Sequence, residues 1–473
     1  MTEQRLTVVG LGPGNPRMIT REAWNALETA GTVYLRTATH PAVAGLPPDL
    51  ELVSFDDTYE RYSDFSDVYR AIVDRLSRLS PGAVYAVPGD PSVGEATVQG
   101  LRQAGIKLRL IPGISFIEPS LAALGLDALD GLVIVDAIGL AAGHHPPFPP
   151  DLGALVCQLH SPFLAGELKL SLMNQYPEEH PVALIHRASL ADERVEWVKL
   201  YEIDRSDSIG DLTSLYISAL PLDSSFETLQ NTVARLRAPD GCPWDREQTH
   251  QSLRKHLLEE AYEALAALDE DDLDGLKEEL GDLLLQIVLQ VQIATEQSNF
   301  RMADVVAGIQ VKLIRRHPHV FGDLQVSGVD QVLRNWEHFK EQETGTGPLA
   351  GVPHSFPALA QAAELQGRAS RLGFDWPSAA GVRVKIHEEL DEIDAAADPE
   401  ARAREIGDLL FTVVNYARWL DADPESELRQ ANQRFRSRFD RMTALSREQG
   451  SRLEDLPPEE MNRLWEAVKR EMG

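Results

Sequence analysis

Two short acidic patterns in the second half of the chain could take part in chemistry. One is Glu-Glu-x-x-Glu, formed by Glu259, Glu260 and Glu263, and the other is Glu-x-x-Asp, formed by Glu279 and Asp282. Carboxylates without a nearby Cys or a suitably spaced His favour a hard ion, Mg²⁺ or alternatively Mn²⁺, over Zn²⁺. Since Mg²⁺ bound by a few carboxylates keeps coordination positions for water and substrate phosphates, the two patterns indicate a phosphate ligand.

The same pattern of acids occurs a second time further along the chain. Its members are Glu388, Glu389, Glu392, Glu405 and Asp408. Glu260 and Glu389 are 129 positions apart, and so are Trp336 and Trp465. A shared spacing at both ends of the unit indicates a duplicated domain rather than a chance similarity.

Each set of acids must be positioned by a pair of helices. At about 100° per residue, one apolar arc of the first helix is formed by Leu253, Leu257, Leu258, Ala261, Ala264, Leu265 and Leu268. Glu260 lies at the edge of this arc, Glu263 lies beside it, and Glu259 points away from it. The spacing of Glu260 and Glu263 puts their carboxylates on neighbouring turns.

The second helix of the pair is predicted to be buried. From Leu280 to Ile293 it is apolar almost all round, and its polar exceptions form one row: Glu279, Asp282, Gln286 and Gln290. Buried charge is costly unless it is paired or bound to metal, and few cations lie nearby in the sequence. The alternative is an acidic face that is merely solvated. The apolar neighbours and the repetition favour a metal site instead.

Cations follow each set of acids. The pairs four residues apart are Lys312 with Arg316, Trp336 with Lys340, Arg434 with Arg438, and Trp465 with Lys469. On a helix this spacing puts both side chains on one face, where the basic groups could clamp phosphates and a Trp could stack on a nucleobase or a guanidinium. The alternative is a set of amphipathic helices with solvated basic residues and a core Trp.

The first half of the chain has a different pattern. Up to about residue 220, β-rich runs such as LTVVGLG, GAVYAVPG, GLVIVDA, PVALIHRA and SLYISAL alternate with helical segments, which predicts an α/β fold. Three turns near strand ends contribute Gly10, Gly12, Gly14, Gly89, Asp90 and Ser115. A glycine-rich turn after a strand lets backbone approach a ligand closely. After about residue 225 the pattern is helical throughout.

Composition limits the class of protein. The 473 residues suggest about two to four domains, and the net charge of −29 makes a nucleic-acid polymer an unexpected partner. Two cysteines, Cys157 and Cys242, are too few for a disulfide framework or a thiolate zinc site, which fits a reducing compartment. We see no signal peptide and no run of about 18 apolar residues, so we expect a cytoplasmic protein that does not enter a membrane.

The helical half resembles tandem MazG-type nucleoside triphosphate pyrophosphohydrolases. The resemblance rests on LRAPDGCPWDREQTHQSLRKHLLEEAYE, EELGDLLLQ and RRHPHVFGD, and it covers about residues 225–473. It implies an all-α bundle, usually dimeric, in which the acids bind Mg²⁺. It also implies that water attacks the α-phosphorus, which releases a nucleoside monophosphate and pyrophosphate. The second copy departs from this pattern, since Arg434 stands in place of Lys312 and the RRHPHVF string is missing.

Carried over by position, the resemblance implies a role for each residue. The implied metal ligands are Glu260, Glu263, Glu279 and Asp282 in the first copy and Glu389, Glu392, Glu405 and Asp408 in the second. Glu259 and Glu388 are implied to be catalytic by orienting water, or to hold a second ion. The implied substrate-binding residues are Lys312, Arg316, Trp336, Lys340, Arg434, Arg438, Trp465 and Lys469.

The first half resembles the tetrapyrrole (precorrin and uroporphyrin) methylase family. VVGLGPGNP, VPGDPSV and IPGIS occur in the right order over about residues 1–220. The resemblance implies a two-lobed α/β domain that binds S-adenosylmethionine in a cleft, with Gly10, Gly12, Gly14, Gly89, Asp90 and Ser115 at the cofactor. Phe116 follows GIS where relatives often have a second Ser. The fusion itself resembles bacterial proteins that join the two families.

We therefore expect three domains and consider three functions. The domains are a methylase-like α/β domain over 1–222 and two MazG-like all-α domains over 225–345 and 352–473. The first function is Mg²⁺-dependent hydrolysis of nucleoside triphosphates by a homodimer. The alternative is an S-adenosylmethionine-dependent methyltransferase whose helical half is regulatory or serves dimerisation. A scaffold without catalysis is the third.

Overall fold

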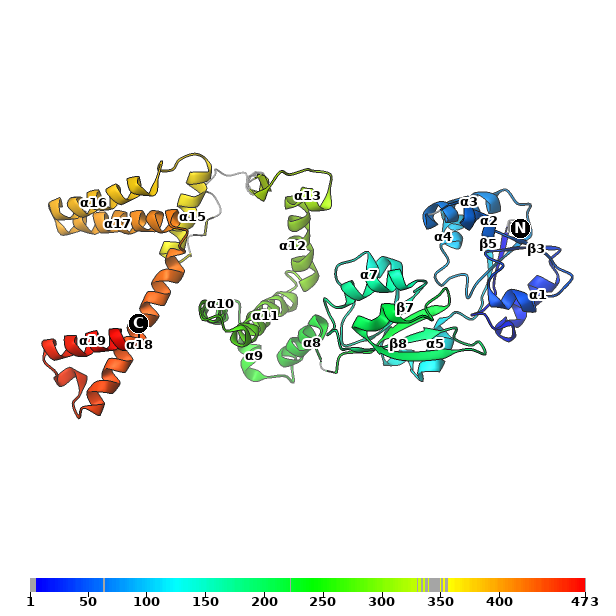
Figure 1. Cartoon of the computed structure of the whole chain (residues 1–473), viewed down its shortest axis with the longest axis horizontal. Helices are drawn as coiled ribbons and strands as arrows, with labels where there is room; N and C mark the ends of the chain where they lie inside the picture. Colours follow the sequence, from blue (N-terminus) through cyan, green and yellow to red (C-terminus); the bar gives the residue numbers. More distant parts are fainter. Residues whose placement is uncertain are drawn as a thin grey trace. The chain divides into compact units, whose positions relative to one another are not determined.

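The computed structural model describes residues 6–62, 64–221, 223–329 and 356–472, together with residues 331–332, 335–336, 339, 349 and 352–353. Its contacts divide the chain into two compact units, Met1–Thr232 and Val233–Gly473 (Figure 1). The described strands all belong to the first unit, and the second unit is helical. The predicted order, an α/β half followed by an all-α half, is confirmed.

A parallel sheet forms the first lobe of the amino-terminal unit. Its strands are β1 (Leu6–Gly10), β2 (Thr32–Leu35), β3 (Glu51–Ser54), β4 (Ala83–Val87) and β5 (Leu108–Ile111), in the order β3-β2-β4-β1-β5. Its helices are α1 (Arg21–Glu28), α2 (Asp56–Arg61), α3 (Phe65–Ser77) and α4 (Ala96–Gln103). Successive side chains of β1 enter different cores, since Val9 packs with Val33 while Val8 packs with Tyr85. The sheet is therefore covered on both faces, as parallel sheets are.

A mixed sheet forms the second lobe. Its strands are β6 (Leu132–Asp136), β7 (Gly153–Cys157), β8 (Pro181–His186), β9 (Arg194–Lys199) and β10 (Thr213–Ile217), in the order β6-β7-β10-β8-β9. The helices α5 (Ile117–Leu124), α6 (Ala137–Ala141) and α7 (Pro162–Leu172) follow β5, β6 and β7 along the chain. β6 and β7 run parallel, and the other neighbours run antiparallel. Leu168 of α7 shares a buried cluster with Val156 and Leu215 of the sheet.

The order of the first sheet brings the glycine turns together. β1 lies between β4 and β5, so the carboxyl ends of these three strands meet at one edge, where α/β sheets bind ligands. Gly12 and Gly89 exchange backbone hydrogen bonds of 3.2 Å and 2.8 Å. Both residues have positive φ, 75° and 64°, which favours glycine. A Cβ atom on Gly10 would lie 2.5 Å from the Gly89 carbonyl oxygen, so this close approach depends on glycine.

Helices build the second unit. The boundary between the units falls within α8 (Phe226–Arg237). The helices that follow are α9 (Pro243–Glu247), α10 (Arg254–Asp269), α11 (Leu273–Glu296), α12 (Met302–Arg316), α13 (Pro318–Phe321), α15 (Ala358–Arg371), α16 (Ala379–Ala395), α17 (Pro399–Trp419), α18 (Pro424–Glu448) and α19 (Pro458–Met472). α10 packs on α11, and α16 packs on α17 (Figure 1). Asp272 and Asp398 cap α11 and α17, since each carboxylate accepts a hydrogen bond from a backbone N–H of the first turn. The two copies therefore begin their second helix in the same way.

The predicted burial of the first helix pair is partly wrong. On α11, Val288 and Ile293 are buried, whereas Leu280 is 53% exposed. Leu253, the residue before α10, is buried, whereas Leu258 of α10 is 57% exposed. Some of the apolar side chains in the predicted pattern are therefore not buried by the described part of the chain.

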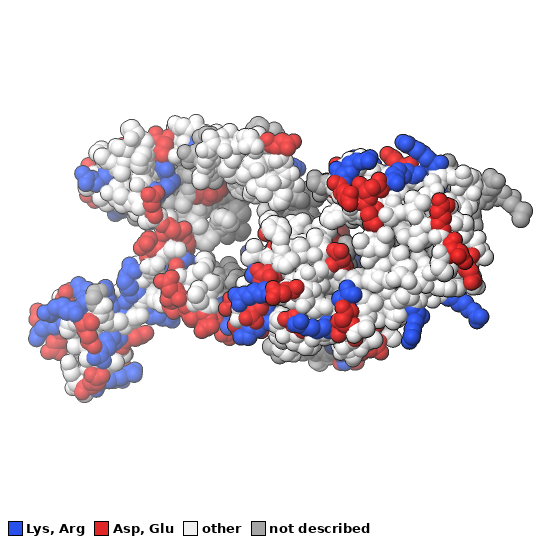
Figure 2. Space-filling view, turned by 45° about the vertical axis from the view of Figure 1, so that its right-hand side comes forward, with Lys and Arg blue, Asp and Glu red and all other residues white. Residues whose placement is uncertain are grey.

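The sequence pattern identified half of the strands. The five quoted β-rich runs correspond to β1, β4, β6, β8 and β10. The domain boundaries stay predictions, because the contacts divide the chain after Thr232 and the second boundary lies almost wholly outside the described residues. No described helix combines the length and the apolar character needed to pass through a membrane. Acidic and basic side chains are interspersed on the face shown in Figure 2.

Candidate functional site

Three carboxylates of the first helix pair converge. Glu260 and Glu263 come from α10 and Glu279 comes from α11, and one oxygen of each lies within 4.8 Å of the others. Glu260 and Glu279 are half-buried, and Glu263 is exposed. Among the described residues, no Lys, Arg or His forms an ion pair with any of the three. The fold therefore gathers three like charges beside an apolar surface and leaves them without a counter-charge from the described chain.

This crowding changes the protonation of two of the acids. The pKa of Glu260 is raised, first by partial burial and then by Glu263 and Asp282. The pKa of Glu279 is raised by burial and by the same two carboxylates. Asp282 thus lies close enough to act on the cluster, although its oxygens are not among the three that converge. A divalent cation would relieve this repulsion, so the donor set fits a hard metal ion.

Glu259 has its partners outside this cluster. Its carboxylate lies 3.0 Å from the Lys255 ammonium and 3.1 Å from Nδ1 of His256. The hydrogen bond from Lys255 is the main cause that lowers the pKa of Glu259. This carboxyl is therefore ionised at neutral pH and is adjacent in sequence to Glu260, a member of the cluster.

The second helix pair repeats the arrangement with one difference. Glu389 and Glu392 of α16 and Glu405 of α17 converge within 4.8 Å, and Glu389 is buried. The Lys385 ammonium lies 3.0 Å from Glu389 and 2.8 Å from Glu388. These hydrogen bonds raise the pKa of Lys385. The second cluster therefore has a cation beside it, because Lys385 precedes Glu389 by one helical turn.

Other predicted site residues of the two copies lie outside these clusters. Asp408 of α17 is exposed and is not one of the converging acids. Lys312 is exposed on α12. The guanidinium carbon of Arg316 lies 5.3 Å from the ring centroid of Trp336, so two residues predicted to bind substrate stack on each other. Lys340 lies outside the described residues.

The predicted substrate-binding residues of the second copy lie on α18 and α19. Arg434 and Arg438 line a pocket of about 320 Å³ together with the carboxyl end of α10, and no acid of the second cluster lines it. The rings of Trp465 and Phe435 are 5.3 Å apart between centroids. Lys469 forms an ion pair with an acid of its own helix. The described contacts therefore do not bring these residues into the acidic cluster.

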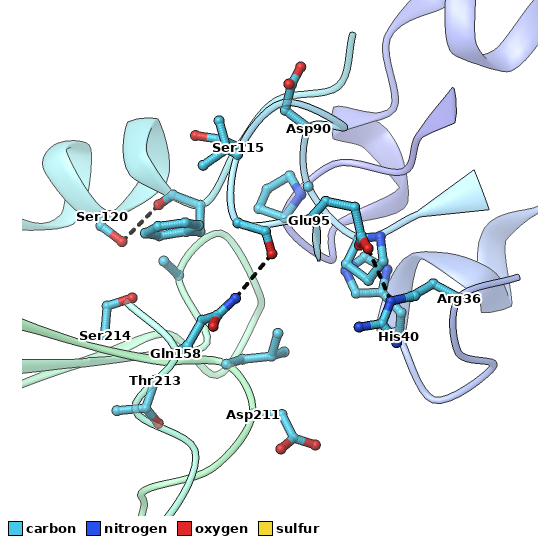
Figure 3. A pocket seen from close by; sticks show the side chains of 18 of the residues that line it. Arg36, His40, Asp90, Glu95, Ser115, Ser120, Gln158, Asp211, Thr213 and Ser214 are labelled. Atoms are coloured by element: carbon cyan, nitrogen blue, oxygen red, sulfur yellow. Dashed lines mark hydrogen bonds and ion pairs between the residues drawn. The ribbon is translucent and has the colours of Figure 1, made fainter. Parts of the chain in front are cut away.

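A second site is a cleft of about 250 Å³ between the two lobes of the first unit (Figure 3). Gly89, Asp90 and Ser115 are among the residues that line it. The Asp90 carboxylate accepts hydrogen bonds from the backbone N–H groups of Ser92 at 2.7 Å and Gly113 at 3.1 Å. Asp90 therefore holds the turns after β4 and β5 together at the cleft wall.

The three glycines of the first turn lie outside the lining of this cleft. Gly10, Gly12 and Gly14 are not among the residues that line the cleft, although Pro13 between them is. Gly10 and Gly12 instead pack against the neighbouring turns, as described above. Gly14 has a φ of 129° and faces the side chain of Leu190 in the second lobe. In this structure the three glycines therefore shape the wall of the cleft and do not line it.

The sequence reasoning missed several polar residues of the cleft. Arg36 follows β2, and its Nε donates to Oε1 of Glu95 at 3.2 Å (Figure 3). His40 lies beside Arg36 in the same wall. From the second lobe, the amide of Gln158 donates to the Gly94 carbonyl oxygen at 3.1 Å. The available signal was the segment RTATHP, in which an Arg and a His four residues apart directly follow a strand.

Comparisons with known proteins match both parts of the chain. Residues 5–204 match the model of the Tetrapyrrole (Corrin/Porphyrin) Methylases, and residues 248–321 match that of the MazG nucleotide pyrophosphohydrolase domain. The nucleoside triphosphate pyrophosphohydrolase/pyrophosphatase MazG of Thermotoga maritima is 46% identical over 247 residues, which cover 52% of this chain and 95% of that protein. The chain belongs to the MazG nucleotide pyrophosphohydrolase family. Its methylase part precedes the MazG part, in the order that the sequence predicts.

One relative matches this chain over almost its whole length, the methylase part and the MazG part together. The Bacillus subtilis (strain 168) protein YabN is 38% identical over 489 residues, which cover 98% of both chains. Among solved structures, uroporphyrin-III C-methyl transferase from Thermus thermophilus complexed with S-adenyl homocysteine is 23% identical. That match covers 45% of this chain and 97% of the other, with a TM-score of 0.34.

Proposed function

We propose that this protein hydrolyses nucleoside triphosphates to a nucleoside monophosphate and pyrophosphate. The observation that supports this most directly is the first acidic cluster, in which Glu260, Glu263 and Glu279 converge within 4.8 Å without a described counter-charge. Relatives named nucleoside triphosphate pyrophosphohydrolases support the substrate class. The ion that fits this donor set is Mg²⁺, with Mn²⁺ as the alternative.

In this proposal, one set of residues binds the metal ion and the nucleotide, and another transfers the proton. Glu260, Glu263, Glu279 and Asp282 would hold the ion in the first copy, and Glu389, Glu392, Glu405 and Asp408 in the second. When bound, Mg²⁺ neutralises phosphate oxygens and activates a water molecule. Lys312, Arg316, Trp336 and Lys340, with Arg434, Arg438, Trp465 and Lys469, would hold the nucleotide.

Glu259 and Glu388 are the candidates for the general base. Because the Lys255 ammonium lowers the pKa of Glu259, this carboxylate is ionised and can accept a proton from the attacking water. The water oxygen forms the new bond to the α-phosphorus, the bond from that phosphorus to the bridging oxygen breaks, and pyrophosphate leaves. Glu388 lies 2.8 Å from Lys385 and has the corresponding place in the second copy.

The test is pyrophosphate release from a panel of ribo- and deoxyribonucleoside triphosphates in Mg²⁺. Wild type is compared with Glu260→Gln, Glu389→Gln and the double variant, and Asp274→Asn removes an exposed carboxylate of α11 as a matched control. Loss of a ligand should lower the rate of the affected copy at least as much as the roughly 10- to 100-fold that losing an outer-shell partner of a metal costs. Loss in one single variant identifies the working copy, and loss only in the double variant means that both copies work. A wild type that releases no pyrophosphate from any nucleotide refutes the proposal.

A second candidate function belongs to the cleft of the first unit, which we propose as an S-adenosylmethionine site for a methyltransferase. The observation in its favour is the wall built by Gly89, Asp90 and Ser115 at the carboxyl ends of β4 and β5. Asp90 and Asp211 supply negative charge that suits a sulfonium cofactor. Calorimetry with S-adenosylmethionine and S-adenosylhomocysteine tests it, and the absence of binding for both refutes it.

We also propose that the chain forms a homodimer and resides in the cytoplasm. Val306, Ile309 and Leu313 share one face of α12 and are 40%, 46% and 47% exposed. Such an apolar stripe is typical of a surface that a partner covers, and a second copy is the partner that the family resemblance implies. The two free cysteines, Cys157 and Cys242, suit a reducing compartment.

A further inference from the structure

The cleft of the first unit is poor in positive charge. Among the described residues that line it, Arg36 is the only Lys or Arg, whereas Asp90, Glu95 and Asp211 are acids. In Figure 3, Arg36 and Glu95 lie on one side and Asp211 lies on the other. A ligand with several carboxylates would meet more negative than positive groups here, which is unfavourable in a partly desolvated site.

Arg36 itself is held firmly. It is 9% exposed, and its Nε is bonded to Glu95 as described above. Its guanidinium carbon lies 5.1 Å from the ring centroid of Tyr59 and 4.7 Å from that of Tyr69. Burial alone would lower the pKa of Arg36, but Glu95 together with Tyr85 and Tyr69 raises this pKa overall, so the group stays charged. The contacts fix the direction of the guanidinium before any ligand arrives.

The guanidinium of Arg36 has a donor nitrogen that bonds no described residue. Nη1 of Arg36 is buried and has no hydrogen-bond partner among the described residues. A buried donor without a partner costs about 1–3 kcal/mol, more when it is charged, so a partner for this group stabilises the site. The fork of an arginine matches a carboxylate or a phosphate group. The oxygen of Glu95 that accepts from Arg36, Oε1, also accepts from the Thr97 hydroxyl at 2.6 Å.

We infer that Arg36 binds the single anionic group, a carboxylate or a phosphate, of a small second ligand in this cleft. The inference rests on the proposed cofactor role of the cleft, in which that ligand is the methyl acceptor. The cleft volume of about 250 Å³ lies just below the usual range for small-molecule pockets, so a second ligand must be small. A polycarboxylate macrocycle such as uroporphyrin does not fit this charge pattern, whereas a compact monoacid does.

The experiment uses the full chain in EDTA, so that the acidic clusters of the second unit hold no metal. Calorimetry first measures the affinity for S-adenosylhomocysteine. Benzoate, methyl phosphate and uroporphyrin III are then titrated separately into that complex. We expect benzoate or methyl phosphate to bind and uroporphyrin III not to bind. Binding of benzoate alone assigns the group as a carboxylate, and binding of methyl phosphate alone assigns it as a phosphate.

Variants assign the binding to the guanidinium. Arg36→Gln should weaken the bound anion by about tenfold or more. Since this change leaves Glu95 buried without its cation, the double variant Arg36→Gln/Glu95→Gln removes both charges and guards against misfolding. Arg75→Gln is the matched control, because Arg75 also stacks on an aromatic ring, that of Phe55 at 4.6 Å, but does not line the cleft.

Three results overturn the inference. Uroporphyrin III binds the complex, or neither benzoate nor methyl phosphate binds it, or the anion binds folded Arg36→Gln and the double variant as tightly as it binds the wild type. If S-adenosylhomocysteine does not bind to the wild type, the proposed cofactor role fails. The anion titrations on the free protein then still decide whether Arg36 binds an anionic group.

Discussion

The ammonium of Lys385 lies 3.0 Å from a carboxylate oxygen of Glu389, the most buried acid of the second cluster. The first copy has His256 at the corresponding position, and its Nδ1 lies 3.1 Å from Glu259 rather than in the cluster. Two helix pairs with the same acids therefore differ in their internal counter-charge. In the second pair a divalent ion must share the carboxylates with an ammonium group.

Lys385→Gln should consequently tighten divalent-ion binding at the second cluster. An ion pair of this partly exposed kind is worth about 1 kcal/mol, so we expect an increase of several-fold, up to about tenfold. Mn²⁺ binding is measured by electron paramagnetic resonance in a Glu260→Gln background, which disables the first cluster. Arg383→Gln, which removes an exposed cation of the same helix, is the control. Unchanged or weaker binding in Lys385→Gln would mean that the ammonium does not compete with the ion.

Gly10→Ala should damage the cleft of the first unit. The added Cβ atom would lie 2.5 Å from the Gly89 carbonyl oxygen and 2.6 Å from the Gly113 nitrogen, and backbone cannot move away easily. We expect a loss of about 1–3 kcal/mol in the free energy of unfolding and weaker binding of S-adenosylhomocysteine. Gly31→Ala is the control, because a Cβ atom there meets nothing within 4 Å. Equal stability of the two variants in urea unfolding would contradict this account of the glycine turns.

His40 should make the first unit sensitive to acid. Burial lowers the pKa of His40 from 6.5 to about 4. Because the unfolded chain takes up the proton more readily, the stability that neutral His40 contributes is complete above about pH 6.5 and is lost as the pH falls through about 4. At about 1.4 kcal/mol per pH unit, the loss approaches about 3 kcal/mol at pH 4.

Calorimetric unfolding between about pH 7.5 and pH 4 measures this loss. His40→Asn should flatten the pH dependence of one transition, while His144→Asn, at an exposed histidine, should leave it unchanged. Parallel pH profiles for wild type and His40→Asn would show that His40 is not buried in its neutral form.

Ile309→Glu should weaken self-association. The substitution places a charge within the exposed apolar face of α12, and a charge buried in an interface without a partner costs several kcal/mol. We expect sedimentation velocity to show a shift from dimer to monomer at micromolar concentration. Gln310→Glu adds the same charge at an exposed position one residue further on and serves as the control. A wild type that is already monomeric, or an Ile309→Glu variant that stays dimeric, would remove α12 from the interface.

The acidic clusters could be predicted because helical spacing brings two of the three acids together. Glu260 and Glu263 are three residues apart on one helix, and only one neighbouring helix must bring Glu279 to them. Lys385 could have been identified by the same rule, since it is one turn before Glu389. The α/β fold of the first half could also be predicted, because its glycine turns follow strong strand patterns.

The rest could not be predicted because it depends on tertiary placement. Arg36 and Gln158 reach the cleft from different lobes, and no sequence spacing relates them. The exposure of Leu258 depends on what covers the helix pair, which the apolar pattern of one chain does not specify. The place of Arg434 beside the end of α10 likewise depends on how distant helices pack.

The most direct test of the central claim is the fate of the water oxygen. The protein is incubated with a nucleoside triphosphate and Mg²⁺ in ¹⁸O-labelled water, and both products are examined by mass spectrometry. Attack at the α-phosphorus by water held at the acidic clusters predicts one ¹⁸O atom in the nucleoside monophosphate and none in pyrophosphate. Glu260→Gln/Glu389→Gln should form neither product. Label in pyrophosphate, or product formation by the double variant at the wild-type rate, would contradict the account.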